Sequence, residues 1–494
     1  MKSRRRILIV VGLLALTSVL ARPLIHLLNT AVRDVDELTE LPPGYVDDAS
    51  RLNQTKVADI WTIPVDSDDP ERQIAQLLSR ARLERRRVTI AGARHSMGGH
   101  TIYPGGIVID TLPFNQMELD EHLGILTVQS GAIWKDVLAF LDRRGWSVEV
   151  MQSNNSFSVG GSISVNCHGW QYDRPPIAST VESFRLMKAD GAIVRCGRTE
   201  NTELFSLALG GYGLFGIILD VQLRVMANER YRLEQFVVPA AWALATFDER
   251  VRDRPDLRMV YARMNVAAET FLENVIINAF FLDPDGEIPP LSDAAMDSLR
   301  RAVFRGSAES EYGKVFRWNA ETNLQPMLAG KIFSRNQLMN EGVEVFQNRS
   351  ADSTDILHEY FVPRHHAVSF VAAMRKIIPR HEGNLLNVTI RAVNEDTDTF
   401  LRYADGPLVA YVMLFVQERN KNGERRMQAM TQELIDAALE HEGRYYLPYR
   451  LHATREQFTA AYPQSKAFFE RKLQYDPDEL FQNQFYIKYG PSPR

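Results

Sequence analysis

In the first half of the chain, short apolar runs alternate with polar residues. In 219–225, LDVQLRV, apolar and polar residues alternate strictly, which is typical of a half-buried β-strand. Compact apolar runs at 57–65, 88–90, 106–110 and 125–129 predict four further strands. The region therefore contains a sheet-forming domain.

Two segments between these strands show the three- and four-residue spacing of an amphipathic helix. Asp69 and Pro70 form a favourable helix start, and Ile74 and Leu78 fall on the apolar face of the helix that follows. A second helix is predicted over 132–145, AIWKDVLAFLDRRG, which ends in a glycine.

Glycine-punctuated strands are expected from about 151 to 230, followed by mixed strand and helix with longer polar connections. The boundaries drawn from this change are a first domain over 51–228, a second over 229–440 and a terminal segment over 441–494. Three glycine-rich turns, 92–99, 160–169 and 210–216, all fall in the first domain.

The N-terminal segment, 1–28, has the make-up of an export signal or a membrane anchor. A basic start precedes an uncharged run, 7–20, which as a helix spans about 21 Å and is shorter than the hydrocarbon layer of a bilayer. The stretch SRRRIL resembles a twin-arginine export signal. Cleavage of the segment and its retention as an anchor both stay open. The acidic stretch 29–50 is expected to be a linker.

Composition narrows the classes of function. The 494 residues are 45% hydrophobic and 24% charged, with a net charge of −5. No basic stripe with interleaved aromatics occurs, which excludes nucleic acid as an expected partner. Two cysteines, Cys167 and Cys196, exclude a disulfide scaffold. No metal site is expected, because Cys167 and His168 have no companions at ligand spacing.

The three glycine turns suggest a bound phosphate-containing cofactor. Glycine allows positive φ and close approach, and successive N–H groups form a concavity suited to a pyrophosphate. The G-x-G-x-x-G pattern of a Rossmann site is absent, so a dinucleotide would be held in another way. Tight turns in a β-rich domain are the plain alternative for each turn taken alone.

The order of motifs resembles one flavoprotein family. AGARHSMGG, VIDTLPFNQM, SVGGSISVNCHG and LALGGYGLFGIILDVQLRV follow one another as in the FAD-binding domain of the vanillyl-alcohol oxidase superfamily. EYFVPRHHAVSFVAAMRKI, NVTIRAV and YDPDELFQNQF are similar to aldonolactone and alditol oxidases, with cytokinin dehydrogenases more distant. The resemblance implies an α+β fold, in which a two-subdomain PCMH-type FAD-binding domain joins an α+β cap domain with a mainly antiparallel sheet.

The resemblance also implies which residues hold FAD. His95 corresponds to the histidine that commonly bonds the flavin covalently, and an ordinary loop histidine is the alternative. The residues expected at the cofactor are Gly92, Ala93, Arg94, His95, Ser96, Met97, Gly98, Gly160, Gly161, Ser162, Ser164, Cys167, His168, Gly169, Gly216 and Ile217.

The residues expected to face the substrate differ from the family pattern. Arg391 matches the arginine of a Glu-x-Arg pair, but Thr389 replaces the glutamate, and Tyr446 stands where a histidine is expected. Arg391 could stabilise an alkoxide or enolate. Tyr446 and His452 are candidate bases.

Taken together, these features predict an exported FAD-dependent oxidase or dehydrogenase, periplasmic or anchored in a bacterial membrane. It would take hydride from the CH–OH group of a sugar acid, aldonolactone or polyol, and pass electrons to oxygen or to a membrane or periplasmic acceptor. A donor that is an amine or hydrophobic alcohol, and a flavin-binding protein without chemistry, remain alternatives.

Overall fold

A computed structural model gives the fold of the chain. It describes residues 21–65, 69–292, 297–308, 310–324 and 331–491. The uncharged run 7–20, on which the export prediction depends, lies outside the described residues.

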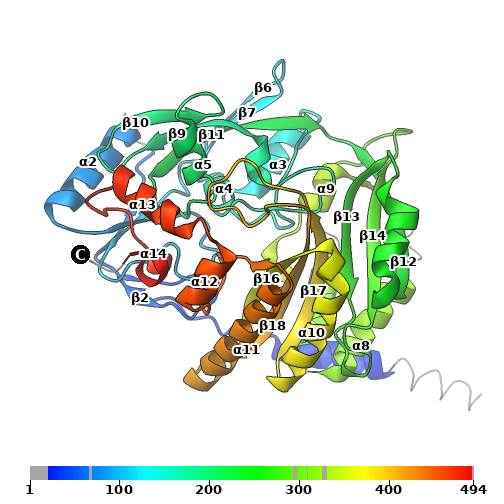
Figure 1. Ribbon diagram of the computed structural model, residues 1–494. Coiled ribbons are helices and arrows are strands. Elements are labelled where there is room, and N and C mark those ends of the chain that lie inside the picture. Colours follow the sequence, from blue (N-terminus) through cyan, green and yellow to red (C-terminus); the bar gives the residue numbers. More distant parts are fainter. Residues whose placement is uncertain (1–20, 66–68, 293–296, 309, 325–330, 492–494) are drawn as a thin grey trace, which may run out of the picture.

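A small parallel sheet opens the first domain (Figure 1). Its strands β3 (Asp59–Thr62), β5 (Ile107–Asp110) and β4 (Val88–Ala91) lie in that order, and helix α2 (Pro70–Leu83) connects β3 to β4. The predicted start of α2 is confirmed, because the Asp69 carboxylate accepts a hydrogen bond from the Arg72 backbone N–H at 2.9 Å. The short pair β1 (Tyr45–Val46) and β2 (Thr55–Lys56) precedes this sheet.

An antiparallel sheet forms the rest of the first domain. Its order is β10-β9-β11-β7-β6, with β8 paired to β11. The strands are β6 (Met117–Asp120), β7 (Ile125–Gln129), β8 (Trp146–Val148), β9 (Val181–Met187), β10 (Ile193–Gly197) and β11 (Ile217–Ala227). The helices are α3 (Trp134–Asp142), α4 (Val159–Ser164), η1 (Ile177–Thr180) and α5 (Thr202–Ala208).

The expectation of strands throughout 151–230 is wrong at two places, since α4 and α5 are helical. In α4, the Gly160 backbone N–H donates to the Ser130 carbonyl at 2.8 Å, and a side chain at Gly160 would collide with Ser130. Tertiary contact of this helix with the end of β7 therefore outweighs the low helix propensity of two adjacent glycines.

The second domain is built on an eight-stranded antiparallel sheet of order β15-β12-β14-β13-β17-β18-β16-β19. Helices α10 (Ala367–Arg380) and α11 (Lys421–Glu440) cover one face (Figure 1). The strands are β12 (Arg230–Pro239), β13 (Leu257–Met264), β14 (Asn274–Leu282), β15 (Ile332–Ser334), β16 (Ser353–Pro363), β17 (Asn384–Val393), β18 (Leu408–Glu418) and β19 (Arg444–Tyr445).

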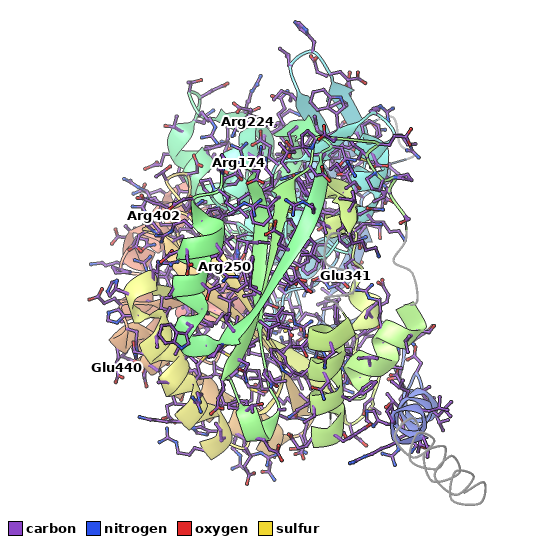
Figure 2. The ribbon with its side chains drawn as sticks, turned by 90° about the vertical axis from the view of Figure 1, so that its right-hand side faces the viewer. Arg174, Arg224, Arg250, Glu341, Arg402 and Glu440 are labelled. Carbon is purple, nitrogen blue, oxygen red and sulfur yellow. The ribbon has the colours of Figure 1, made fainter. Side chains whose placement is uncertain are left out.

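Shorter helices complete the second domain. They are η2 (Ala240–Trp242), α6 (Ala243–Phe247), η3 (Asp248–Arg252), η4 (Ala268–Thr270), α7 (Asp297–Arg305), α8 (Glu311–Asn319), η5 (Ala320–Leu324), α9 (Arg335–Met339), η7 (Val343–Val345) and η8 (Arg364–His366). The imidazoles of His365 and His366 in η8 lie 3.7 and 3.9 Å from the Glu442 carboxylate. In Figure 2 the strands of this sheet separate Arg250, beside α6, from Glu341 on the other side.

The terminal segment returns to the first domain through α12 (Arg455–Ala461), α13 (Ser465–Tyr475) and α14 (Gln484–Tyr489). Phe481 pairs with Val88 of β4 in a parallel bridge, and Asp478 lies 3.1 Å from Arg82 of α2. The red helices of Figure 1 accordingly lie beside the blue ones.

Residues 21–33 form a helix that packs on α8. The Arg22 guanidinium sits 4.1 Å above the Tyr312 ring, and the His26 ring meets the same ring edge-on. Asp34 pairs with Arg301 at 2.5 Å. The stretch predicted as a linker thus begins with residues attached to the second domain. Within the described part of the chain, no helix has the length and apolar character needed to cross a membrane.

Candidate functional site

Residues of all three glycine turns line one cavity of about 230 Å³, here called the inner cavity. Its walls come from both domains, because β16, β17 and the terminal segment add Glu359, Arg391 and Tyr449. The turn residues that line it are Gly92, Ala93, Arg94, His95, Ser96, Gly160, Gly161, Ser162, Ser164, Val165, Cys167, His168, Tyr212, Gly213 and Gly216.

Close packing between the turns requires glycine at particular positions. A Cβ at Gly92 would lie 2.0 Å from the Ser158 hydroxyl, and one at Gly160 would lie 2.7 Å from the Ser130 Cβ. Arg94 and Tyr212 have φ of +56° and +53°, a conformation that L-residues seldom adopt. Backbone strain of this kind at residues that line a cavity is typical of a ligand site.

Polar atoms without partners point to the kind of ligand. The hydroxyl oxygens of Ser96, Thr101 and Ser130 are buried, and among the described residues none has a hydrogen-bond partner. All three residues line the inner cavity. Since buried hydroxyls are normally hydrogen-bonded, a polar ligand is expected to satisfy them. These hydroxyls and the glycine backbone fit the phosphates and ribose of FAD.

His95 is held in one orientation beside the cavity. Its Nε2 lies 3.1 Å from the Ser156 carbonyl oxygen, and its ring packs 4.3 Å from the Phe157 ring. A carbonyl can only accept, so Nε2 carries the proton and Nδ1 keeps its lone pair. Burial lowers the pKa of His95, which keeps the imidazole neutral near pH 7. A neutral imidazole with a free lone pair is a nucleophile.

His168 is paired with a buried carboxylate that the sequence did not single out. Its Nε2 lies 2.5 Å from Glu359 Oε1, and the Tyr449 hydroxyl donates to Glu359 Oε2 at 3.2 Å. The neighbouring Cys167 is buried, which raises the pKa of its thiol to about 12. Cys167 is therefore a small neutral wall residue.

A second, larger cavity of about 1100 Å³, the outer cavity, adjoins the first. Ser153, Asn154, Phe157, Arg391 and Val412 line both. The face of β13, β17 and β18 opposite α10 and α11 forms its floor, and carries Tyr261, Arg263, Asn387, Thr389, Arg391, Val412 and Leu414. A substrate in the outer cavity would thus reach the inner one past Arg391.

The predicted catalytic residues take different places. Arg391 lies at the junction, where its guanidinium donates to the His168 carbonyl at 3.2 Å and the Ser153 hydroxyl at 3.0 Å. Tyr446 lines the inner cavity, but its hydroxyl donates to the Val165 carbonyl at 2.8 Å, and burial raises its pKa well above the ordinary value. His452 is buried under α11, bonded to Glu424 and Thr431 at 2.9 and 3.0 Å. That placement favours a structural role for His452 over that of a base.

Four of the expected cofactor residues lie off the inner-cavity wall. Met97 lines the outer cavity instead. Gly98 packs against the Tyr449 backbone and Gly169 against the Met151 backbone. Ile217 points into the hydrophobic core, and its neighbour Ile218 lines the cavity. Successive residues of a strand face opposite sides, so the family likeness located the strand correctly and its facing residue one position early.

Glu359 and Ser130 also line the inner cavity, and sequence reasoning missed both. Glu359 lies in β16, which also carries the buried polar residues Thr354, Asp355 and His358, so its carboxylate does not stand out in the sequence.

Comparisons with known proteins agree with this geometry. A family model described as "FAD binding domain" matches residues 69–197, and one described as "D-arabinono-1,4-lactone oxidase" matches 289–489. Together the two models cover more than half of the chain.

Several curated relatives align at low identity. An "Uncharacterized oxidoreductase ORF5 in fasciation locus" of Rhodococcoides fascians is 26% identical over half of this chain and 56% of its own length. A "Putative D-arabinono-1,4-lactone oxidase" of Neurospora crassa is 27% identical over 42% of this chain and 38% of its own length. Cytokinin dehydrogenase 10 of Oryza sativa is 24% identical over 74% of this chain and 72% of its own length. The chain thus spans roughly a third to a little over half of the first relatives it matches.

The two matched models fall on the two domains that enclose the inner cavity, and the relatives carry oxidoreductase names. The chain belongs to the PCMH-type FAD-linked oxidase superfamily, in which an FAD-binding domain is joined to a domain of the aldonolactone oxidase type.

Proposed function

We propose that the protein is an FAD-dependent oxidoreductase that oxidises a CH–OH donor of the sugar-acid, aldonolactone or polyol type. The supporting observation is that the inner cavity, built from the three glycine turns, opens past Arg391 into a large outer cavity whose walls carry both charged and apolar side chains. One compartment fits the cofactor and the other has room for a polar donor. The electrons would leave to oxygen or to a membrane or periplasmic acceptor.

Bound FAD would supply an oxidised ring that takes a hydride, two electrons and one proton, from the donor carbon. The donor hydroxyl then loses its proton and becomes a carbonyl. Arg391 is placed to stabilise negative charge that develops on that oxygen, because its guanidinium lies at the entrance between the cavities. The Tyr446 hydroxyl donates a hydrogen bond to a backbone carbonyl, so the role proposed for Tyr446 is to shape the wall of the inner cavity.

His95 is proposed to bond the flavin covalently through Nδ1. The nitrogen would replace one hydrogen of the flavin's ring methyl group, that hydrogen would leave as a proton, and the two electrons would pass through the ring to the acceptor that reoxidises it in turnover. The Ser156 carbonyl fixes the ring and selects the tautomer, and burial keeps the ring neutral. These are the two conditions a nucleophilic imidazole needs.

A visible absorbance scan of the purified protein, followed by anaerobic addition of candidate donors, tests the proposal. We expect a flavin spectrum that bleaches with at least one hydroxylated donor and returns with an acceptor. A colourless protein that takes up no FAD on reconstitution would contradict the cofactor assignment. A yellow protein that reduces by light and with no donor would be a binder without chemistry.

The alternative donor, an amine or hydrophobic alcohol, draws support from the cytokinin dehydrogenase names among the relatives. Aromatic and aliphatic walls of the outer cavity, including Trp170 and Tyr261, would suit an apolar ring. A donor panel that contains isopentenyl adenine beside aldonates, lactones and polyols distinguishes the alternative donor class from the CH–OH class.

Export by a folded-protein route is also proposed, since FAD is loaded in the cytoplasm. We expect the double change Arg4→Lys and Arg5→Lys to retain the holoprotein inside the cell, measured by fractionation. Unchanged secretion would contradict it. Cleavage after Ala21 would leave the contact of Arg22 with Tyr312 in place.

A further inference from the structure

Two arginines lie on neighbouring strands at the floor of the outer cavity. Arg263 of β13 pairs in register with Thr389 of β17, and Arg391 lies two residues further along β17 on the same face. Strand geometry puts residues two apart about 7 Å from each other. The strip Arg263–Thr389–Arg391 therefore offers two cations within the length of a small molecule, with a neutral hydroxyl between them.

Arg391 has no carboxylate partner among the described residues. Its two terminal nitrogens donate to neutral oxygens, the His168 carbonyl and the Ser153 hydroxyl, and its Nε is buried without a bond. A guanidinium in a partly buried position normally meets an anion, because burial of an unpaired charge is costly.

Arg263 shares its one carboxylate with another arginine. Glu321 Oε1 lies 3.1 Å from Arg263 Nη1 and 3.0 Å from Arg317 Nε. Asn387 accepts from both guanidiniums, at 2.6 and 3.1 Å, and Arg263 Nε is left without a partner. Two positive charges thus meet one negative charge. Burial raises the pKa of Glu321, and the neighbouring Arg263 opposes that rise.

Two acidic side chains elsewhere on the outer cavity are paired with arginines. Arg305 holds Asp355 at 2.5 Å, and Arg300 pairs with Glu341. Arg51 and Arg419 also line this cavity and donate to backbone carbonyls. Arg391 differs from these two in its place, because it lines the inner cavity as well.

We propose that this strip is a carboxylate-binding site and that the donor is a hydroxy acid, such as a sugar acid, in preference to a neutral polyol or lactone or to a cationic amine. The inference rests on the proposed function and narrows its substrate class. Arg263 and Arg391 would bind the carboxylate, and the hydroxyl-bearing carbon would extend towards the inner cavity.

Three probes with one carbon skeleton test the charge preference in the holoprotein: gluconate, glucitol and glucamine, of charge −1, 0 and +1. Binding is measured by calorimetry and by the flavin difference spectrum, neither of which requires turnover. We expect gluconate to bind at least tenfold more tightly than glucitol, and glucamine more weakly than either. The gluconate advantage should shrink as salt is added.

Arg263→Gln should lower gluconate affinity about tenfold or more and leave that for glucitol within twofold. Arg391→Gln should lower gluconate affinity by at least as much, and by more than it lowers glucitol affinity. Arg263→Lys keeps the charge and should keep most of the preference, which separates charge from folding. Arg250→Gln removes the same charge from the opposite side of the sheet (Figure 2) and should change nothing. Melting temperatures and flavin content identify a variant that folds badly.

Equal binding of gluconate and glucitol, or a gluconate preference that survives both glutamine variants, would overturn the proposal. The result is separable from the proposed function. Gluconate that binds selectively but never bleaches the flavin supports the carboxylate site and contradicts the oxidation. If glucitol bleaches the flavin and binding shows no charge preference, the oxidation is supported and the carboxylate site is contradicted.

Discussion

The orientation of one imidazole decides how the cofactor would be attached. With Nε2 of His95 donating to Ser156, the free lone pair is on Nδ1. We expect the yellow colour of the wild type to stay with the polypeptide after acid precipitation, and that of His95→Ala to pass into the supernatant. Because the turns still form the cavity, the variant should retain flavin before acid treatment. His122→Ala, at an exposed position, is the control. Free flavin from the acidified wild type would contradict a covalent bond.

Another buried histidine makes the second domain sensitive to acid. Burial beneath α11, and to a lesser degree the neighbouring His452, lower the pKa of His358 to about 3. In the unfolded chain the pKa is about 6.5, so the unfolded state binds the proton more readily below that pH. The contribution to stability is fully present above about pH 6.5 and is lost as the pH falls from 6.5 towards 3. The expected loss is about 1.4 kcal/mol per pH unit, or about 2 kcal/mol at pH 5.

Urea unfolding at pH 7.5, 6 and 5 measures this loss. His358→Phe should reduce the pH slope of the free energy of unfolding by that amount, although it also removes bonds to Tyr360 and Thr431 that lower stability at every pH. The exposed His122→Phe should leave the slope unchanged. An unaltered slope in His358→Phe would show that other groups control the acid transition.

At the scale of helices and turns, the shape of the inner cavity depends on the contact between the first glycine turn and the start of α4. A methyl group at Gly92 would overlap Ser158, which immediately precedes that helix. Gly92→Ala should therefore push the turn from the helix and reduce the flavin-to-protein ratio severalfold. Ser158→Gly removes both clashing atoms, so the double variant should recover much of the flavin content. A double variant no better than Gly92→Ala would mean that the turn itself, and not this contact, fails.

Sequence reasoning succeeded at elements whose signal is local. The alternating pattern of 219–225 falls within β11, and Asp69 caps α2. It failed for α4, whose helical state depends on β7. Glu359 was missed because its partner His168 is 191 residues away in the chain. Contacts of that range leave no periodic trace in a sequence.

At the scale of the whole molecule, the site exists only where three parts of the chain meet. The first domain supplies the glycine turns, the second supplies Glu359 and Arg391, and the terminal segment completes the cavity wall with Tyr449. The Met97 backbone N–H donates to the Pro448 carbonyl at 2.8 Å, and the Gln484 backbone N–H donates to the Gly99 carbonyl at 3.2 Å. The cofactor turn is thus held by residues almost 400 positions away.

The Asn483 side chain ties the terminal segment to two of the glycine turns at once. Its side-chain N–H groups donate to the carbonyls of His100 and Tyr212 at 2.9 and 3.0 Å, while its oxygen caps α14 by accepting from Tyr486. Asn483→Ala leaves two buried carbonyls without donors and the helix without a cap, at a cost of about 2–5 kcal/mol. Asn483→Asp keeps the cap, loses the donors and turns a carboxylate oxygen towards the two carbonyls, so it is the stricter test of these cross-links. We expect both variants to lower the melting temperature and flavin content, and Asn420→Ala, which removes only the exposed cap of α11, to spare the flavin. Full flavin content in Asn483→Asp would mean that the two turns hold their positions without the terminal segment.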